Sequence, residues 1–198
     1  MTTITPKPLA GVICCAVLLT ATIVPASAQS ANRTVSDPSG RYTISFPTAW
    51  EVVSMNATPV AGEIVNQMGK NFFSMLMAID PGASASAPTL LMVMSLPLQT
   101  AISPRTFGLM TQESMSEKLD GYSVINEGTA TIAKRAAFYR YFTMRGKRGE
   151  DLYGVMVYFT VGKTGYMIFG AAENQPDTIR KSFTDIGMIL ETFRPTGK

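Results

Sequence analysis

The chain has 198 residues and a formal net charge of +3, with 17 lysines and arginines against 14 aspartates and glutamates. That charge is too small to indicate a nucleic acid as partner. The sequence contains no histidine, which excludes catalysis or metal binding through imidazole. Function must therefore rest on carboxylates, lysines, hydroxyls, methionines or the shape of the surface.

Residues 1–28 have the pattern of a cleaved signal peptide. Lys7 supplies a positive start, an apolar run of about 14 residues extends from Gly11 to Val24, and Ala26-Ser27-Ala28 is a small-residue cleavage pattern. The run is shorter than the roughly 20 residues that a membrane-spanning helix needs. We expect export to the periplasm or the extracellular space, or to the thylakoid lumen in a photosynthetic host.

Both cysteines, Cys14 and Cys15, lie inside this predicted signal peptide. The mature chain would then have no thiol for a disulfide or for nucleophilic catalysis. A lipid-anchoring cysteine is the alternative use, but Gly11-Val12-Ile13 is a poor match to the segment that precedes such a cysteine. We expect a mature chain that begins near Gln29 and has no transmembrane segment.

The remainder is predicted to be a flexible N-terminus, residues 29–39, followed by one domain over residues 40–195. Alternating apolar residues predict a strand that ends at Pro47, and a second extended segment starts at Trp50, which we expect to pack against a sheet. Residues 63–80 fit both helical and strand spacing, and we favour a strand from Phe72. A loop of small residues over 81–88 and an apolar strand over 89–98 follow.

Two helices are predicted in the second half of the chain. Ser103 and Pro104 have the side chains favoured at a helix start, and the helix is expected to run to about Leu119. Strands are predicted over 122–126, 129–134 and 136–145. Pro176 opens the last helix, whose apolar stripe is the clearest amphipathic pattern in the chain: Ile179, Phe183, Ile186, Leu190 and Phe193.

The segment from Asp151 to Phe169 predicts a hairpin at the centre of the fold. Its two strands meet at Gly162-Lys163-Thr164-Gly165, and glycine permits the positive φ that such a turn needs. Both faces of the first strand are apolar, which is typical of a strand covered on both sides. The predicted core of the domain is Trp50, Val157, Phe159, Ile168, Phe183, Ile186 and Leu190.

Two parts of the sequence resemble the PsbP-like family. The first is Ser39 to Pro47 followed by Trp50, and the second is Thr164-Gly165-Tyr166 together with the helix end Leu190 to Arg194. The resemblance implies an α+β fold, an α/β/α sandwich with a mainly antiparallel sheet and helices on both faces. Members of this family dock on photosystem II, bind a small GTPase, or are exported bacterial proteins of unknown role. The family carries no catalytic residues or cofactor to transfer.

The densest charged stretch, residues 145–151, contains Arg145, Lys147 and Arg148. It is either a solvated hairpin tip or a docking patch for an acidic partner or anionic lipid head groups. Glu150 and Asp151 weaken the second interpretation because they neutralise part of the positive charge.

Two methionine pairs, Met75 with Met77 and Met92 with Met94, have the spacing that places each pair on one face of a strand. If the two strands were neighbours, four thioethers could meet, and soft sulfur suits Cu(I). Methionine is also an ordinary filler of hydrophobic cores, which is the simpler interpretation.

Other chemistry is less well supported. Gly162-Lys163-Thr164 resembles the end of a phosphate-binding loop, but Val157 stands where that motif needs its first glycine. No Gly-x-Ser-x-Gly turn is present, so a serine-type hydrolase is a weaker alternative. We therefore predict an exported, non-catalytic module that binds a protein of the envelope or of a membrane complex, without a cofactor. A photosystem II extrinsic subunit is the alternative in a photosynthetic host, and the sequence does not determine the oligomeric state.

Overall fold

The computed structural model describes residues 32–53, 74–83 and 88–196. The predicted signal peptide, with Lys7, Cys14 and Cys15, lies outside these ranges, as does the ambiguous segment up to residue 73. The predicted strand from Phe72 is described from Ser74 onward, where it forms β4.

The described chain forms two antiparallel sheets and two helices. A three-stranded sheet has the order β1 (Asn32–Ser36), β2 (Tyr42–Pro47), β10 (Arg194–Pro195). A seven-stranded sheet has the order β3 (Glu51–Val53), β4 (Ser74–Asp80), β5 (Thr89–Pro97), β9 (Thr164–Glu173), β8 (Asp151–Val161), β7 (Arg135–Arg145), β6 (Ser123–Ile132). The helices are α2 (Pro104–Lys118) and α3 (Pro176–Glu191).

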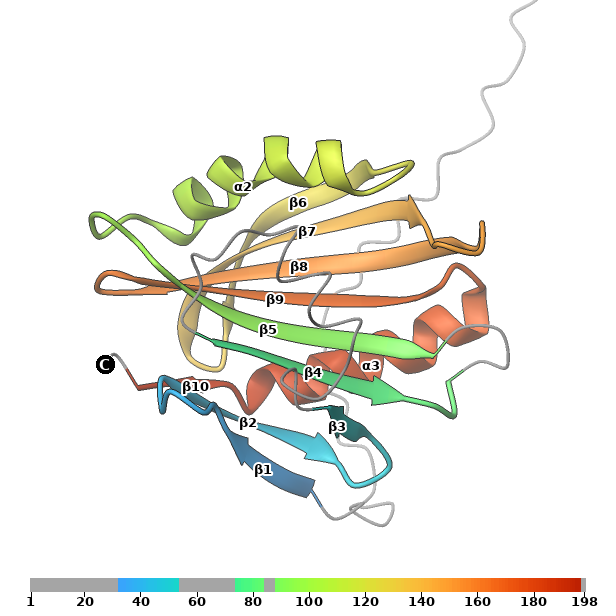
Figure 1. Cartoon of the computed structure of the whole chain (residues 1–198), viewed down its shortest axis with the longest axis horizontal. Coiled ribbons are helices and arrows are strands. Elements are labelled where there is room, and N and C mark those ends of the chain that lie inside the picture. The colour runs from blue at the N-terminus through green and yellow to red at the C-terminus, as the bar shows by residue number, and fades with distance from the viewer. Residues whose placement is uncertain (1–31, 54–73, 84–87, 197–198) are drawn as a thin grey trace, which may run out of the picture.

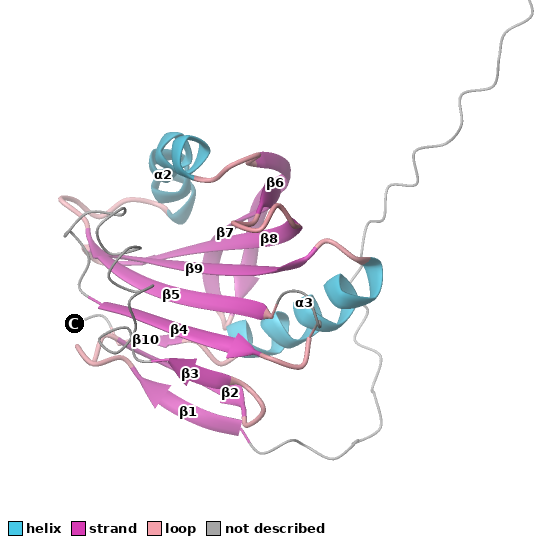
Figure 2. Cartoon of the chain, turned by 45° about the vertical axis from the view of Figure 1, so that its right-hand side comes forward, coloured by secondary structure: helices cyan, strands magenta, loops and turns pink. Residues whose placement is uncertain are grey.

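The large sheet is covered on both faces. Helix α2 lies over β7 and β8 on one face, while α3 and the three-stranded sheet cover the other (Figures 1 and 2). This arrangement confirms the predicted α+β sandwich with a mainly antiparallel sheet and helices on both sides.

The hairpin of β8 and β9 lies in the interior of the seven-stranded sheet, with β9 as the fourth strand. The strands are joined at Gly162 and Lys163, and Gly162 has a φ of 57°, a conformation that costs glycine little. Nearly all of β9 is buried, which explains why the sequence of this hairpin is apolar on both faces.

The α3 face of the sheet packs branched and aromatic side chains. Phe193, just after α3, is fully buried, and its ring centroid lies 5.5 Å from those of Tyr42 and Tyr166 and 5.1 Å from that of Phe159. Trp50 is buried and stacks on Phe46, as expected from the sequence. The strand residues of this core join the three-stranded sheet to the large sheet through apolar burial.

Helix α3 is fixed to the sheet by polar contacts as well as by its apolar stripe. The hydroxyls of Ser182 and Thr89 are 2.6 Å apart in a buried hydrogen bond, and Lys181 forms a 3.3 Å ion pair with Asp80. Of the predicted core residues, all are buried except Phe183, which is only half-buried. The periodic stripe missed Ile189, which is fully buried.

Two predictions about the secondary structure are wrong. Residues 32–36, assigned to the flexible N-terminus, form β1, because their backbone pairs with β2 from Asn32↔Pro47 to Ser36↔Thr43. The two short strands predicted between residues 122 and 134 are a single strand, β6, whose register shifts between Val124 and Asn126. A local bulge of this kind interrupts alternation in the sequence without ending the strand.

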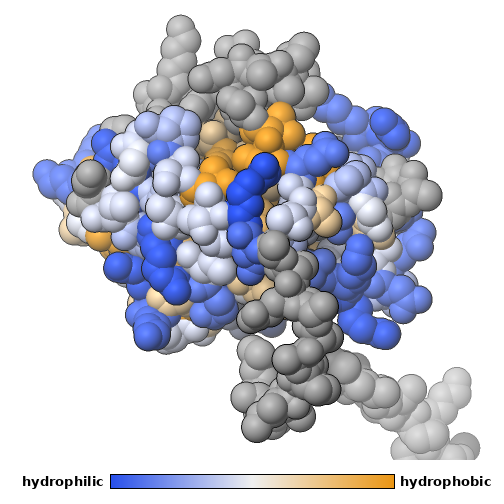
Figure 3. Space-filling model, turned by 90° about the horizontal axis from the view of Figure 1, so that it is seen from below, coloured by the Kyte–Doolittle hydropathy of each residue, from blue (hydrophilic) through white to orange (hydrophobic). Residues whose placement is uncertain are grey.

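The side of the molecule on which β1 and β3 lie has a mixed surface. Seen from below, hydrophilic side chains dominate it, and hydrophobic side chains gather in one patch near the middle of the view (Figure 3). The lower edge of the large sheet is β3, a strand of three residues paired with β4. This edge is therefore short, in contrast to the opposite edge formed by β6.

Candidate partner-binding and metal sites

The predicted docking tip is the turn between β7 and β8. Arg145 is the last residue of β7 and pairs in register with Asp151, while Lys147 and Arg148 lie exposed in the turn. The turn is ordered by its own hydrogen bonds. The Gly146 amide donates to the Glu150 carbonyl at 2.7 Å, and the Arg148 amide donates to the Glu150 carboxylate at 2.9 Å.

The tip carries acidic groups beside its cations. Glu150 and Asp151 belong to the turn, and the loop after α2 adds Asp120, whose carbonyl oxygen accepts from the Arg145 amide at 2.8 Å. Because these carboxylates lie beside the cations of the tip, they reduce the positive potential that a distant partner would experience. The three predicted residues are thus together on one exposed turn, in a mixed electrostatic environment.

The four predicted methionines lie together on two neighbouring strands. Strand β4 pairs with β5, and the register places Met75 opposite Met94 and Met77 opposite Met92. Side chains of directly opposed residues have Cβ atoms about 4.5–5.5 Å apart on the same face. Met94 is also opposite Met167 on β9, which extends one row to three thioethers across three strands.

Methionine is concentrated on the α2 face of the large sheet. Half of the buried residues in that core are methionines: Met75, Met92, Met94, Met115, Met156 and Met167. Among the residues that the structure describes, the buried core of the α3 face contains none. The neighbouring-strand condition for a thioether site is therefore met, and the residues present fit a soft cation such as Cu(I) by donor type. Among the described residues, no three or more aspartate, glutamate, cysteine or histidine side chains gather where they could hold a metal.

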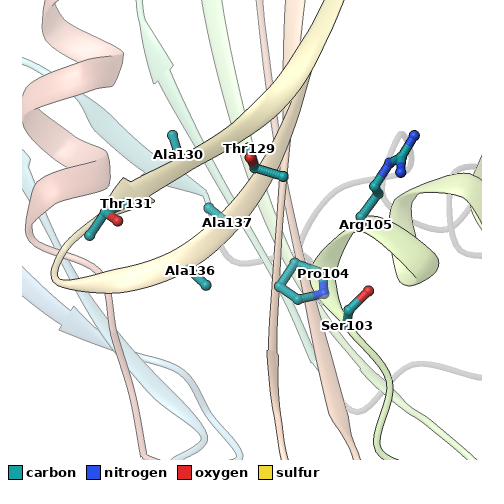
Figure 4. Close-up of a pocket in the computed structure, with 8 residues that line it drawn as sticks. All are labelled: Ser103, Pro104, Arg105, Thr129, Ala130, Thr131, Ala136 and Ala137. Atoms are coloured by element: carbon teal, nitrogen blue, oxygen red, sulfur yellow. The ribbon is translucent and has the colours of Figure 1, made fainter.

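A groove lies between the start of α2 and the hairpin of β6 and β7, with a volume of about 520 Å³ (Figure 4). One wall is the first turn of α2, and the other is the end of the hairpin. Its lining includes Ser103, Pro104, Arg105, Thr129, Thr131 and Ala136. A second hollow of about 280 Å³ shares Arg105 and Thr129 with it and reaches Glu127. The two hollows form one shallow groove that follows β6.

The sequence explains how α2 comes so close to the sheet. Ser103 caps the helix, its hydroxyl accepting from the Thr106 amide at 3.0 Å, and Pro104 occupies the first turn as predicted. Gly108 faces the sheet, and a Cβ atom there would lie 2.4 Å from Phe138 Cδ1. Glycine at this position therefore allows the helix to pack directly on the aromatic rings of Phe138 and Tyr158.

Beneath the groove lies a buried arginine that no pattern in the sequence singled out. The Arg140 side chain is 0% exposed, and its Nη2 lies 2.8 Å from Glu127 Oε2 and 3.2 Å from Gln112 Oε1. Its Nη1 lies 3.5 Å from the carbonyl oxygen of Gly108. Arg140 thus connects β6, β7 and α2 through one guanidinium group, which positions both walls of the groove.

The electrostatics of this cluster follow from burial and the ion pair. Burial alone lowers the pKa of Arg140, but the hydrogen bonds to Glu127 and the negative charge of that carboxylate raise the pKa above its ordinary value. Burial raises the pKa of Tyr122 and raises that of Tyr158 to about 12, so both phenols stay neutral. No described group pairs with the buried Tyr122 hydroxyl. Arg140 therefore stays charged. Its burial could have been predicted from the alternation along β7, because Arg140 occupies a position of that strand that faces the core.

Because both faces of the large antiparallel sheet are covered, the chain is an α+β sandwich, and its fold is PsbP-like. Cyanobacterial PsbP from Synechocystis sp. PCC 6803 superposes with a TM-score of 0.57 at 10% identity, covering 88% of this chain and 98% of that one. The Pseudomonas aeruginosa protein PA94, of unknown function, has a TM-score of 0.54 at 11% identity, covering 84% and 99%.

The Ran-binding protein Mog1p of Saccharomyces cerevisiae has a TM-score of 0.53 at 9% identity, covering 84% of this chain and 96% of that one. No protein-family model and no curated protein matches the sequence. Identities this low show a shared fold and transfer no site residues. Neither helix of the described chain has the length and apolarity required to cross a membrane.

Proposed function

We propose that the mature chain, from about residue 29, is an exported, non-catalytic binding module that acts through protein–protein contacts in the envelope or with a membrane complex. The observation that supports this most is the groove between α2 and β6, a concave surface held on a rigid sheet by the Arg140 cluster. Mog1p, which shares the fold, is described as a Ran-binding protein, so the scaffold is compatible with binding another protein.

The exposed tip of Arg145, Lys147 and Arg148 is proposed as a second contact that contributes to the encounter with an acidic partner. Exposed charges act mainly on the association rate, and their effect decreases once the Debye length falls below about 10 Å. The acidic neighbours of the tip keep this contribution small relative to that of the groove.

Site-specific photo-cross-linking in the native envelope tests the binding function. A photoreactive residue replaces Thr129 in the groove, Lys147 at the tip, or Thr184 on the exposed side of α3 as the control. We expect a discrete cross-linked partner from Thr129, a weaker one from Lys147, and none from Thr184. Equal background products from all three positions would refute the binding module, and labelling of the protein by an active-site serine probe would favour the hydrolase alternative.

The tip is tested separately by a Lys147→Glu, Arg148→Glu double variant. If the tip takes part in binding, partner capture by this variant becomes weaker and less dependent on salt. Unchanged capture and unchanged salt dependence would show that the tip is only a solvated turn, and the groove would remain the proposed binding site. If the partner proves to be a photosystem component of a photosynthetic host, the photosystem alternative is supported.

A second candidate function is binding of Cu(I), supported by the register that places Met75 and Met77 opposite Met94 and Met92. Thioether sulfur is a soft ligand, and the metal would be held by these neutral donors. The test is competition with a Cu(I) chelator by the wild type and by a variant with all four methionines changed to leucine. Leucine preserves volume, so the fold is expected to survive. Equal competition by both proteins would show that these methionines only fill the core.

A further inference from the structure

We propose that β6 accepts an extended, acidic segment of the partner protein as an additional strand, whose side chains on the α2 side lie in the groove. This inference rests on the proposed binding function and specifies its mode and the chemistry of the bound segment. Four independent features of the described chain support it: the open edge, the sequence of β6, the groove beside it and the charge at its end.

The two edges of the large sheet differ in length and accessibility. At one edge, β3 has three residues. At the other edge, β6 has ten residues and pairs only with β7 among the described strands. An unpaired edge strand presents a row of free N–H and C=O groups, which is a template for the backbone of another chain.

The second half of β6, Gly128 to Ile132, lacks the residues that protect edge strands from such pairing. It contains neither lysine nor proline, and the bulge of the strand lies earlier, between Val124 and Asn126. The one acidic residue of the strand, Glu127, is engaged by the buried Arg140. The half of the strand that borders the groove is therefore a regular, uncharged edge.

The groove provides space for the side chains of an added strand. Side chains of neighbouring strands alternate between the two faces, so every second residue of the segment would point toward α2. Thr129 and Thr131 line the groove from β6, and Arg105 lines it from the helix. Exposed apolar residues flank this surface: Leu109 on α2 is 44% exposed, and Ile125 in the bulge is 53% exposed. Leu109 follows Arg105 by four residues, which places the two on one side of the helix.

The charge at the hairpin end of the groove selects an acidic segment. Arg105 is exposed on α2 and lines the groove, and Lys134 is exposed in the turn that joins β6 to β7, close to Thr131 and Ala136, which also line the groove. Neither cation forms an ion pair with a described carboxylate, and the Glu191 carboxylate in the same region accepts from the Ala133 amide at 3.0 Å instead. Aspartate or glutamate near one end of the bound segment would supply the opposite charge.

Selection from a random octapeptide library displayed on phage identifies the preferred segment even while the partner itself is unidentified. We expect selected peptides to combine alternating β-branched or aromatic residues with aspartate or glutamate at one end. Charge reversal by Arg105→Glu and Lys134→Glu should weaken binding of the resynthesised peptide about tenfold or more. The control, Arg33→Glu with Lys163→Glu, reverses two exposed cations elsewhere and should bind normally.

Backbone pairing is tested on the peptide itself, so that folding of the protein is unaffected. Peptides methylated on alternate amide nitrogens are made in both registers. One register removes the N–H groups that face β6 and should abolish binding, whereas the other should bind. Amide hydrogen exchange should slow in β6 upon binding of the unmodified peptide and remain unchanged in the β7–β8 tip.

Strand addition is refuted if the library yields no binder, if both methylated registers bind equally, or if slowed exchange maps outside β6. It is also refuted if the protein forms a concentration-dependent dimer through β6 and the peptide only shifts the equilibrium between monomer and dimer. A partner captured by cross-linking at the tip, combined with failure of these peptide tests, would leave the binding function intact and disprove only this mode. Failure of both experiments would reject the binding function itself.

Discussion

The two faces of the seven-stranded sheet are packed in different ways. Among the described residues, the buried core of the α3 face is built from branched aliphatic and aromatic side chains without methionine, whereas that of the α2 face is half methionine, and most of its other residues are aromatic. The α2 face also contains the buried, charged Arg140. Branched and aromatic residues fit in few arrangements, while methionine adapts to irregular space. The comparison indicates that the α3 face stabilises the fold and the α2 face carries the surface available for binding.

The largest difference between the faces is expected from removing one aromatic ring of the α3 core. Phe193→Ala should lower the free energy of unfolding by about 3–5 kcal/mol, because the ring is fully buried among three other aromatic rings. Phe183→Ala is the matched control and should cost less, since Phe183 is only half-buried. Urea unfolding measures both, and a loss for Phe193→Ala no larger than that for Phe183→Ala would contradict stronger anchoring at the C-terminal end of α3.

On the α2 face, the most damaging change should be one that leaves a charge buried without its partner. Glu127→Ala removes the carboxylate from the fully buried Arg140 and should cost about 3 kcal/mol, at the low end for buried pairs because Glu127 is 37% exposed. Arg140→Met should cost less, since it removes the charge together with its need for a partner. Urea unfolding of the two variants decides this, and a Glu127→Ala cost below that of Arg140→Met would contradict the role of Arg140 in connecting β6, β7 and α2.

Buried tyrosines on both faces should contribute to the response to alkaline conditions, because burial raises the pKa of Tyr42 on the α3 face as well as that of Tyr158 on the α2 face. Burial raises the pKa of Tyr158 to about 12 from its ordinary value near 10. A group with a raised folded-state pKa contributes its full stability below the unfolded pKa, so this contribution is lost as pH rises from about 10 to 12. Tyr158→Phe should flatten the decline of stability in this window. If the stability of wild type and variant declined equally over this pH range, the decline would be caused by other groups.

The smallest expected effect compares two neighbours on β5 that face opposite sides of the sheet. Val93 belongs to the α3 core and Met94 to the α2 core. Val93→Leu overpacks a rigid environment and should cost about 1–3 kcal/mol, whereas Met94→Leu conserves volume and should cost less than about 1.5 kcal/mol. Thermal unfolding of both variants tests whether the α3 face is the less tolerant one. A larger cost for Met94→Leu would reverse the proposed roles of the two faces.

Several local elements were predictable because their signals lie within a few residues. The cap at Ser103 and Pro104, the turn at Gly162 and the apolar stripe of α3 depend on local backbone geometry and on helical spacing. The resemblance to the PsbP-like family also predicted the sandwich, which the structure confirms. The sequence likewise indicated that Met75 and Met77 share one face, as do Met92 and Met94.

Only the tertiary structure decided which strands are neighbours and what each face covers. Periodicity shows that residues share a face, but it carries no information about the partner strand, which is why the pairing of Met75 with Met94 had to await the register. Strand β1 escaped prediction because backbone pairing with β2 orders a polar segment that has no apolar pattern of its own. The sequence by itself thus determined those elements whose causes are local, namely the two helices and the hairpin of β8 and β9. The buried Arg140, the groove and the open edge of β6 arise from contacts between distant segments, and only packing brings those together.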